Sequence, residues 1–219
     1  MICTSFGQIN RAFHPDLLDG LECAEIRLDL LSLSAAMVKK TFSRPQTLIA
    51  TCRPGTMSDE RRISLLSAAL EAGAAYIDLD FHETESIQAP LISLARERGC
   101  RLILSYHNHN FTPKLPFLRK KVADCLQAGA DLVKIACLVK EPAEAARLVA
   151  LYDLCRARPG SLLAIGMGAA GSWTRIAALL LGAPFSYASP DDLKATAPGQ
   201  MSTSLMARLL GMLAPEPAT

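Results

Sequence analysis

Residues 101–137 read RLILSYHNHNFTPKLPFLRKKVADCLQAGADLVKIAC, and this stretch contains the repeat unit that decides the fold. The run from Arg101 to His107 is rich in β-forming residues, and Leu118 to Ala128 has the apolar periodicity of a helix. Gly129 stands where a helix end needs a left-handed residue, and a second β-rich run, Leu132 to Cys137, follows. The stretch therefore predicts a strand–helix–strand unit with parallel strands.

The same alternation extends outward over the whole chain. The other predicted strands are Ile2 to Phe6, Ala24 to Leu30, Thr47 to Cys52, Ala75 to Phe81, Leu162 to Met167 and Phe185 to Ala188. Helical periodicity separates them, for example over Asp59 to Ala72, Ile87 to Arg98, Ala143 to Arg156 and Thr174 to Leu181. Eight units in one chain without a break in composition predict an α/β fold, a single (β/α)8 TIM barrel with parallel strands.

Length and composition favour one domain. The chain has 219 residues, half of them apolar, which is ample material for one core. The connection from Gln8 to Cys23 has room only for a short helix around Pro15 to Leu18. We predict a single barrel domain over residues 1–213 and a flexible C-terminal tail over residues 214–219.

Charge and hydropathy exclude several classes of function. The formal net charge is +2, which removes the main electrostatic argument for a nucleic-acid partner. Every apolar run is shorter than a membrane span needs, and the N-terminus has no basic segment typical of a secretory signal. Seven cysteines without C-x-x-C spacing indicate buried thiols in a reducing compartment rather than a zinc or disulfide framework. We therefore expect a cytoplasmic protein without membrane contact.

Three charges share one face of the second predicted strand. Side chains alternate along a strand, so Glu25, Arg27 and Asp29 point one way and the intervening aliphatic residues point the other. In a barrel the aliphatic residues would face the helices and the charges the interior. Charges there need partners or a substrate, so the two interpretations, a structural ion-pair cluster and a binding site, carry equal weight.

The fifth predicted strand ends in a pair of histidines, His107 and His109. Residues two apart on an extended segment lie on the same side, so both would face the barrel mouth if the strand continues that far. Active sites of this fold lie at the carboxyl ends of the strands. Because imidazole titrates near neutral pH, acid–base catalysis by His107 is favoured over a structural histidine.

Lys134 stands in the middle of an apolar predicted strand. Lysine is almost never buried without a partner or a function. In a dry pocket the neutral amine is favoured and becomes a nucleophile toward a carbonyl. The alternative is a lysine whose charged end reaches solvent at the strand end. The functional interpretation is favoured.

Two glycine-containing segments near the C-terminus are candidate ligand-binding loops. Gly166 to Gly171 matches the dinucleotide fingerprint G-x-G-x-x-G, but fewer than 50 residues remain after it, too few for the further βαβ units of that fold. Arg175 follows in the next helix and offers a carboxylate-binding group. The turn at Pro198-Gly199 would hold Thr196 and Gln200 at the barrel mouth, or it is only a helix-entry turn.

Taken in order, these segments resemble type I 3-dehydroquinate dehydratase, a shikimate-pathway enzyme. The resemblance covers nearly the whole chain and depends on the ordered set rather than on any single piece. It is carried by Glu25-Ile26-Arg27-Leu28-Asp29, Thr51-Cys52-Arg53, Asp78-Leu79-Asp80, Ser105-Tyr106-His107, Thr112-Pro113, Asp131-Leu132-Val133-Lys134-Ile135-Ala136, Gly168-Ala169-Ala170-Gly171-Ser172-Trp173-Thr174-Arg175 and Ala197-Pro198-Gly199-Gln200.

The resemblance implies conversion of 3-dehydroquinate to 3-dehydroshikimate and water, with Lys134 as the Schiff-base lysine and His107 as the general acid–base. It implies that Arg175 meets the substrate carboxylate and that ring hydroxyls meet Glu25, Arg27, Arg53, Thr196 and Gln200. No metal or cofactor is implied.

The chain departs from the family pattern at two places. Many members have an acid shortly after the arginine that matches Arg53, and that acid orients the catalytic histidine. Here residues 54–60 read PGTMSDE, so the role is unfilled or falls to Glu60 or Asp80. Thr196 stands where a serine is common, which keeps the hydroxyl.

Alternative functions remain open at this point. Another Schiff-base barrel lyase of the aldolase type would use the same lysine, and a metal-dependent hydrolase would use His107, His109, His82 and Asp78. A carboxylate-binding barrel without catalysis is a third option. A small-molecule substrate is expected in the first two cases. The sequence does not fix the oligomeric state, and a homodimer is one option.

Overall fold

The eight predicted strands form one parallel sheet that curls into a barrel. A computed structural model describes residues 1–7, 13–193 and 195–213. In this part of the chain the strands are β1 (Ile2–Phe6), β2 (Cys23–Arg27), β3 (Thr47–Thr51), β4 (Tyr76–Asp80), β5 (Arg101–Asn108), β6 (Leu132–Leu138), β7 (Leu162–Met167) and β8 (Ser186–Ala188). They pair in the order β7-β6-β5-β4-β3-β2-β1-β8, with every pair parallel. The (β/α)8 prediction is confirmed.

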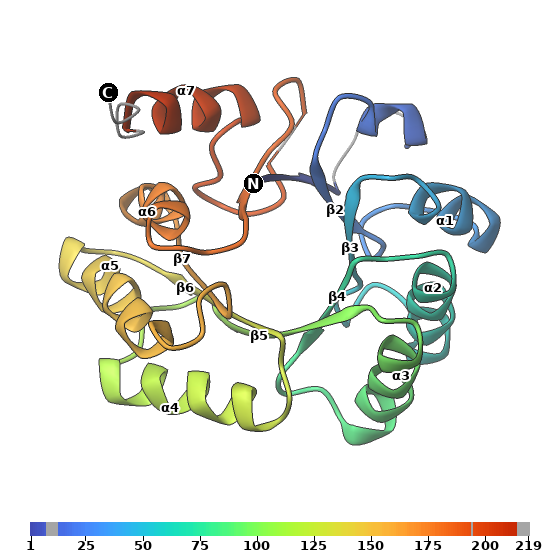
Figure 1. Cartoon of the computed structure of the whole chain (residues 1–219), viewed down its shortest axis with the longest axis horizontal. Helices are drawn as coiled ribbons and strands as arrows, with labels where there is room; N and C mark the ends of the chain where they lie inside the picture. Colours follow the sequence, from blue (N-terminus) through green and yellow to red (C-terminus); the bar gives the residue numbers. More distant parts are fainter. Residues whose placement is uncertain (8–12, 194, 214–219) are drawn as a thin grey trace.

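Helices surround the ring of strands, as Figure 1 shows. The α-helices found among the described residues are α1 (Ala35–Phe42), α2 (Asp59–Glu71), α3 (Glu85–Glu97), α4 (Leu115–Gln127), α5 (Pro142–Val149), α6 (Thr174–Leu180) and α7 (Thr203–Leu213). Short 3-10 helices cover Pro15–Leu18, Ala150–Cys155 and Ala169–Gly171. Serine side chains cap α1 and α2, because Ser34 accepts from the Met37 N–H at 3.2 Å and Ser58 from the Arg61 N–H at 3.4 Å.

The two faces of each strand have different partners. On β5, Leu102 and Leu104 alternate with Ser105 and His107 and pack into the apolar core. Nearly all residues of β6 are buried on both faces, as expected for a parallel sheet covered by helices. The polar side chains on the other face of the strand therefore point into the barrel interior, as predicted.

The strand order leaves a seam between β7 and β8, which no ladder joins in the part of the chain that is described. Arg175, at the start of α6, lies across this seam. Its Nη1 donates to the Tyr187 carbonyl of β8 at 3.4 Å, and its Nε donates to the Gly199 carbonyl at 3.2 Å. The backbone N–H of Gly168, just after β7, donates to the Pro198 carbonyl at 3.1 Å. The barrel is thus closed here by side-chain and loop contacts.

Two predicted boundaries were wrong. The second strand ends at Arg27 and not at Leu30, because the backbone turns there and the N–H groups of Leu30 and Leu31 donate to the Arg27 carbonyl. The helix predicted over Ala143 to Arg156 ends as α5 at Val149 and continues as a 3-10 helix. In that segment the Tyr152 hydroxyl accepts from the Ala164 N–H of β7 at 3.0 Å, so tertiary contact outweighs the local periodicity.

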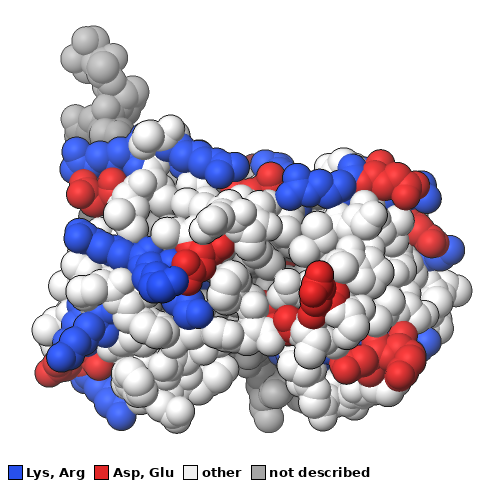
Figure 2. Space-filling model, turned by 90° about the horizontal axis from the view of Figure 1, so that it is seen from below, with Lys and Arg blue, Asp and Glu red and all other residues white. Residues whose placement is uncertain are grey.

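Other sequence expectations can be placed on the structure. All seven cysteines are buried and unpaired, and Gly129, which was expected at a helix end, has a positive φ of 89°. The tail at residues 214–219 lies outside the described residues, so the domain limits stay a prediction. No helix in the described ranges has the length and apolar character to cross a membrane. On the face drawn in Figure 2, basic and acidic side chains lie side by side.

Candidate active site

A cavity of about 490 Å³ opens at the carboxyl ends of the strands. All eight site residues predicted from the sequence line it: Lys134, His107, Glu25, Arg27, Arg53, Arg175, Thr196 and Gln200. They come from β2, β5, β6, the segment after β3, the start of α6 and the loop after β8. The fold therefore brings together residues that lie up to 175 positions apart.

Lys134 lies inside the barrel, with 7% of its side chain exposed. Its Nζ donates to Asp78 Oδ2 at 2.9 Å and lies 3.7 Å from Glu25 Oε1. On another side Nζ lies 4.2 Å from the ring centroid of Tyr187, whose π face attracts a cation. The amine is thus held in the cavity by two carboxylates and one aromatic ring.

Asp78, on β4, is the centre of the charge network around the lysine. Its Oδ2 also accepts from Arg53 Nη2 at 2.8 Å, while Arg53 Nη1 donates to the Ser105 hydroxyl at 2.8 Å. Burial alone would raise the pKa of Asp78, but the charges of Arg53 and Lys134 outweigh it and hold this pKa well below its usual value. Asp78 is therefore an anion that fixes both cations.

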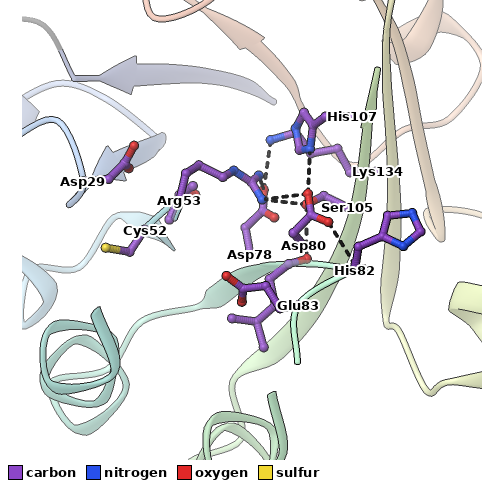
Figure 3. Close-up of polar contacts among 12 residues, drawn as sticks. Asp29, Cys52, Arg53, Asp78, Asp80, His82, Glu83, Ser105, His107 and Lys134 are labelled. Atoms are coloured by element: carbon purple, nitrogen blue, oxygen red, sulfur yellow. Dashed lines mark hydrogen bonds and ion pairs between the residues drawn. The ribbon is translucent and has the colours of Figure 1, made fainter. Parts of the chain in front are cut away.

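His107 extends from β5 into the same cavity, and Figure 3 shows it above the carboxyl group of Asp80. Its Nδ1 lies 3.4 Å from Asp80 Oδ2. Burial and the positive charges of Arg53 and Lys134 lower the pKa of His107 to about 4, although Asp80 opposes this. The imidazole is therefore neutral at neutral pH and able to accept a proton.

Glu25 and Arg27 project inward from β2, as predicted. Glu25 accepts hydrogen bonds from the Ser5 hydroxyl and, at 2.9 Å, from the Thr51 hydroxyl. Burial would raise the pKa of Glu25, but Lys134 and Arg27 outweigh it and lower the value. Arg27 forms a bidentate pair with Asp29, at 3.0 Å from Nε and 2.6 Å from Nη2. Asp29 makes this pair because the chain turns back after Arg27.

Arg175 carries a donor that has no partner. Its Nη2 is buried and makes no hydrogen bond to the described residues, although the guanidinium lines the cavity. Burial lowers the pKa of Arg175 to about 10, which leaves the group charged at neutral pH. An unpaired buried cationic donor is costly, so this position favours an anionic ligand group such as a carboxylate.

The loop after β8 places Thr196 and Gln200 over the cavity. Gln200 Oε1 accepts from the Thr196 N–H at 2.7 Å and from the Thr196 hydroxyl at 3.1 Å. That hydroxyl also lies 2.8 Å from Ser5 Oγ, which connects the loop to β1. At Gly199, which has a φ of 76°, a Cβ would lie 2.3 Å from the Gly168 carbonyl oxygen. Only glycine allows the loop to pack this closely.

Several alternatives lose support from this geometry. The ring of His82 packs edge-on against Phe81 and Tyr106, and His82 does not line the cavity, so the four residues of the metal-hydrolase hypothesis do not converge. In the ranges 1–7, 13–193 and 195–213, no three His, Cys, Asp or Glu side chains are grouped to hold a metal ion. The glycines of the G-x-G-x-x-G segment serve close packing, because a Cβ on Gly166 would lie 2.8 Å from Gly171 Cα.

Sequence reasoning missed some members of the site. Ser5, Thr51 and Tyr187 contact the charged residues but were not singled out. A signal was available, because each is a polar residue in a predicted strand. The register that pairs Ser5 with Glu25 is visible only in the structure. His109, by contrast, was expected at the barrel mouth. It lines the cavity although β5 ends one residue before it, and its ring is parallel to that of His107, with 6.1 Å between the ring centroids.

The fold and the site together define a (β/α)8 barrel with a lysine-centred polar cavity at the carboxyl ends of its strands, where barrel enzymes have their active sites. The profile of the type I 3-dehydroquinase family matches residues 13–217. The chain belongs to this family. The resemblance drawn from the sequence is confirmed, as is the dehydratase class of enzyme.

Individual relatives cover almost the whole chain. A 3-dehydroquinate dehydratase from Desulfotalea psychrophila is 33% identical over 216 residues, which span 94% of each chain. One from Syntrophobacter fumaroxidans is 31% identical over 205 residues, spanning 87% of this chain and 86% of that one. The crystal structure of the enzyme from Aquifex aeolicus has the same fold, with a TM-score of 0.80 at 24% identity over 99% of this chain and 100% of that one.

Proposed function

We propose that the chain converts 3-dehydroquinate into 3-dehydroshikimate and water through an imine on Lys134. The observation that carries the proposal is the position of Lys134 Nζ, inside the barrel and at the wall of the cavity. We infer the substrate from membership of the family. The residues around the amine offer the acid–base and binding groups that dehydration of this substrate needs.

The substrate is a β-hydroxy ketone, and its dehydration requires loss of a proton from the carbon next to the carbonyl. The resulting carbanion is poorly stabilised unless an electron sink is present. Lys134 would attack the carbonyl carbon and release one water, and the iminium would then accept the electron pair of the broken C–H bond. Expulsion of the hydroxyl with a proton gives a second water, and hydrolysis of the imine consumes one water and frees the lysine.

His107 would move the protons in this sequence. As a neutral imidazole it can take the proton from the carbon, and the resulting imidazolium can return it to the departing hydroxyl. Asp78, with its strongly lowered pKa, would remain an anion and orient the lysine. No step in this sequence requires a metal or a dissociable cofactor.

Arg175 would bind the substrate carboxylate through its unpartnered Nη2, which aligns the ring for the reaction. The ring hydroxyls would meet Glu25, Arg27, Arg53, Thr196 and Gln200, which surround the rest of the cavity. The mixture of carboxylates, guanidinium groups and hydroxyls suits a polyhydroxylated ring, because it offers both donors and acceptors.

The direct test measures the conjugated enone of the product by its ultraviolet absorbance. We expect the wild-type chain to form product that is lighter than 3-dehydroquinate by one water. Lys134→Met should abolish turnover, and His107→Ala should reduce kcat by about 10²-fold. Lys140→Met, which changes an exposed lysine, is the matched control and should leave kcat unchanged.

Failure of the wild-type chain to dehydrate the substrate would overturn the proposal. Full activity in Lys134→Met would overturn the imine mechanism, and cleavage of a carbon–carbon bond would favour the aldolase alternative.

The cytoplasmic location and the single catalytic domain over residues 1–213 are further parts of the proposal. Cell fractionation tests the location, and light scattering on the purified chain decides whether it forms a homodimer.

A further inference from the structure

The carboxylate of Asp80 faces the imidazole of His107, with 3.4 Å between Asp80 Oδ2 and His107 Nδ1. The two residues lie on neighbouring parallel strands, and Asp80 pairs in register with Ser105, two residues before His107. Both side chains therefore reach the carboxyl edge of the sheet from adjacent positions. A separation of 3.4 Å is long for a hydrogen bond, and we expect it to shorten when the imidazole gains a proton, because charge-assisted hydrogen bonds are shorter.

Asp80 is itself held in one orientation. Its Oδ1 accepts from the backbone N–H of His82 at 2.9 Å, as Figure 3 shows. Its Oδ2, the atom that faces His107, also lies 4.0 Å from Arg53 Nη1. One oxygen is thus used to fix the carboxyl group, and the other is directed at the imidazole.

Strand β4 supplies two carboxylates to two different groups. Asp78 and Asp80 are two residues apart and face the barrel interior together. Asp78 contacts Lys134, whereas Asp80 contacts His107. Glu60, the other acid that the sequence left open, lies exposed in the first turn of α2 and does not line the cavity.

We propose that Asp80 is the positioning residue of His107, a role that rests on the proposed function of His107 as the acid–base. Asp80 accepts a hydrogen bond from the Nδ1–H of His107, so the lone pair of Nε2 is the one available to the substrate. When Nε2 takes a proton, the carboxylate stabilises the imidazolium that forms, as carboxylates do behind other catalytic histidines. Strand β4 thereby supplies the orienting acid that many family members have shortly after the arginine that matches Arg53.

Asp80→Asn is the decisive variant, because it keeps the size of the side chain and removes its charge. We expect kcat to fall by about 10²-fold or more, with KM changed by less than about 3-fold. Nitrogen-15 NMR of His107 should show the Nδ1–H tautomer in the wild-type chain and a mixture of tautomers in the variant. Asp80→Glu, which restores the charge, should recover most of kcat, and Glu60→Gln should leave both readouts unchanged.

The proposal is overturned if Asp80→Asn keeps kcat within about 3-fold of wild type with the same tautomer. Equal losses in Asp80→Asn and Asp80→Glu without a change of tautomer also overturn it, since they indicate a purely structural role. If the wild-type chain does not dehydrate 3-dehydroquinate, the proposed function fails. The tautomer of His107 in the two variants then still decides whether Asp80 orients the imidazole.

Discussion

At the scale of single residues, burial and charge set the protonation state of His107. The pKa of about 4 means that the folded protein keeps this imidazole neutral at pH values where an ordinary histidine is half protonated. Burial and the cations Arg53 and Lys134 cause the shift. The same two cations are held by Asp78, so the proton affinity of His107 depends on residues of β4, of β6 and of the segment after β3.

This shift predicts that His107 makes the fold sensitive to acid. Between pH 6.5 and pH 4 the unfolded chain binds a proton at His107 that the folded chain excludes. The associated stability is therefore complete above about pH 6.5 and is lost as the pH falls toward 4, up to about 3 kcal/mol. Urea unfolding across this range should give a smaller fall in the free energy of unfolding for His107→Asn than for wild type. Equal falls in the two proteins would contradict the assignment.

The acids of the site add to this sensitivity only at lower pH. The pKa values of Asp78, Asp80 and Glu25 are lowered in the folded chain, because neighbouring cations and hydrogen bonds outweigh burial. Their stabilising contribution is present above the unfolded values near pH 4 and is lost as the pH falls below them. The range from pH 6.5 to about 5 thus isolates the contribution of the histidine.

At the scale of elements, Arg62 of α2 connects two of the loops around the barrel mouth. Its Nε and Nη2 donate to the Cys52 carbonyl at 3.2 and 2.9 Å, and Nη2 also pairs with Glu83 after β4. Only 2% of the Arg62 side chain and 6% of that of Glu83 are exposed. The segment that carries Arg53 and the end of β4 that carries Asp80 are therefore fixed relative to each other.

Breaking this connection should be costly. We expect Arg62→Met to lower the free energy of unfolding by about 3–5 kcal/mol, because it leaves the buried carboxylate of Glu83 unpaired. The matched control is Lys39→Met, which breaks an exposed 3.0 Å pair with Glu71 and should cost less than about 1 kcal/mol. Denaturant unfolding measures both. Similar costs for the two variants would show that Arg62 does not carry the connection.

The sequence predicted a strand or helix well where the local sequence pattern and the tertiary contacts favour the same structure. Strands Ile2–Phe6 and Leu162–Met167 were predicted with the bounds observed, because each is a short β-rich run that is followed directly by a glycine. The helix Ala35–Phe42 was not singled out, although Ser34 is a typical cap for it. The end of β2 was missed because the alternation of side chains does not report the backbone turn after Arg27, where the N–H groups of Leu30 and Leu31 donate to the Arg27 carbonyl.

At the scale of the whole molecule, the barrel explains why the site could be predicted from separate segments. In a parallel barrel, the carboxyl end of every strand reaches the same mouth, so residues chosen for their chemistry at strand ends converge without further information. The eight residues line one cavity for this reason. What the sequence could not give is which acid contacts which cation, since this depends on strand register and side-chain direction.

The guanidinium group of Arg175 lies at both the cavity and the seam between β7 and β8, and the sequence indicated only the first. The sequence indicated a carboxylate-binding group, and the structure places it at the cavity with one donor, Nη2, that makes no hydrogen bond within the described part of the chain. The structure adds that the same guanidinium bridges the seam between β7 and β8 through two backbone carbonyls. If the proposed function holds, the side chain that binds the substrate carboxylate also helps to close the barrel, which no local sequence pattern reveals.

The central claim, that Lys134 forms an imine with the substrate, is tested most directly by chemical trapping. The purified chain is incubated with 3-dehydroquinate and borohydride, digested, and analysed by mass spectrometry. The account predicts a reduced adduct of the ligand on the peptide that contains Lys134, and its absence in Lys134→Met. Active protein in which that peptide keeps its original mass would contradict the account.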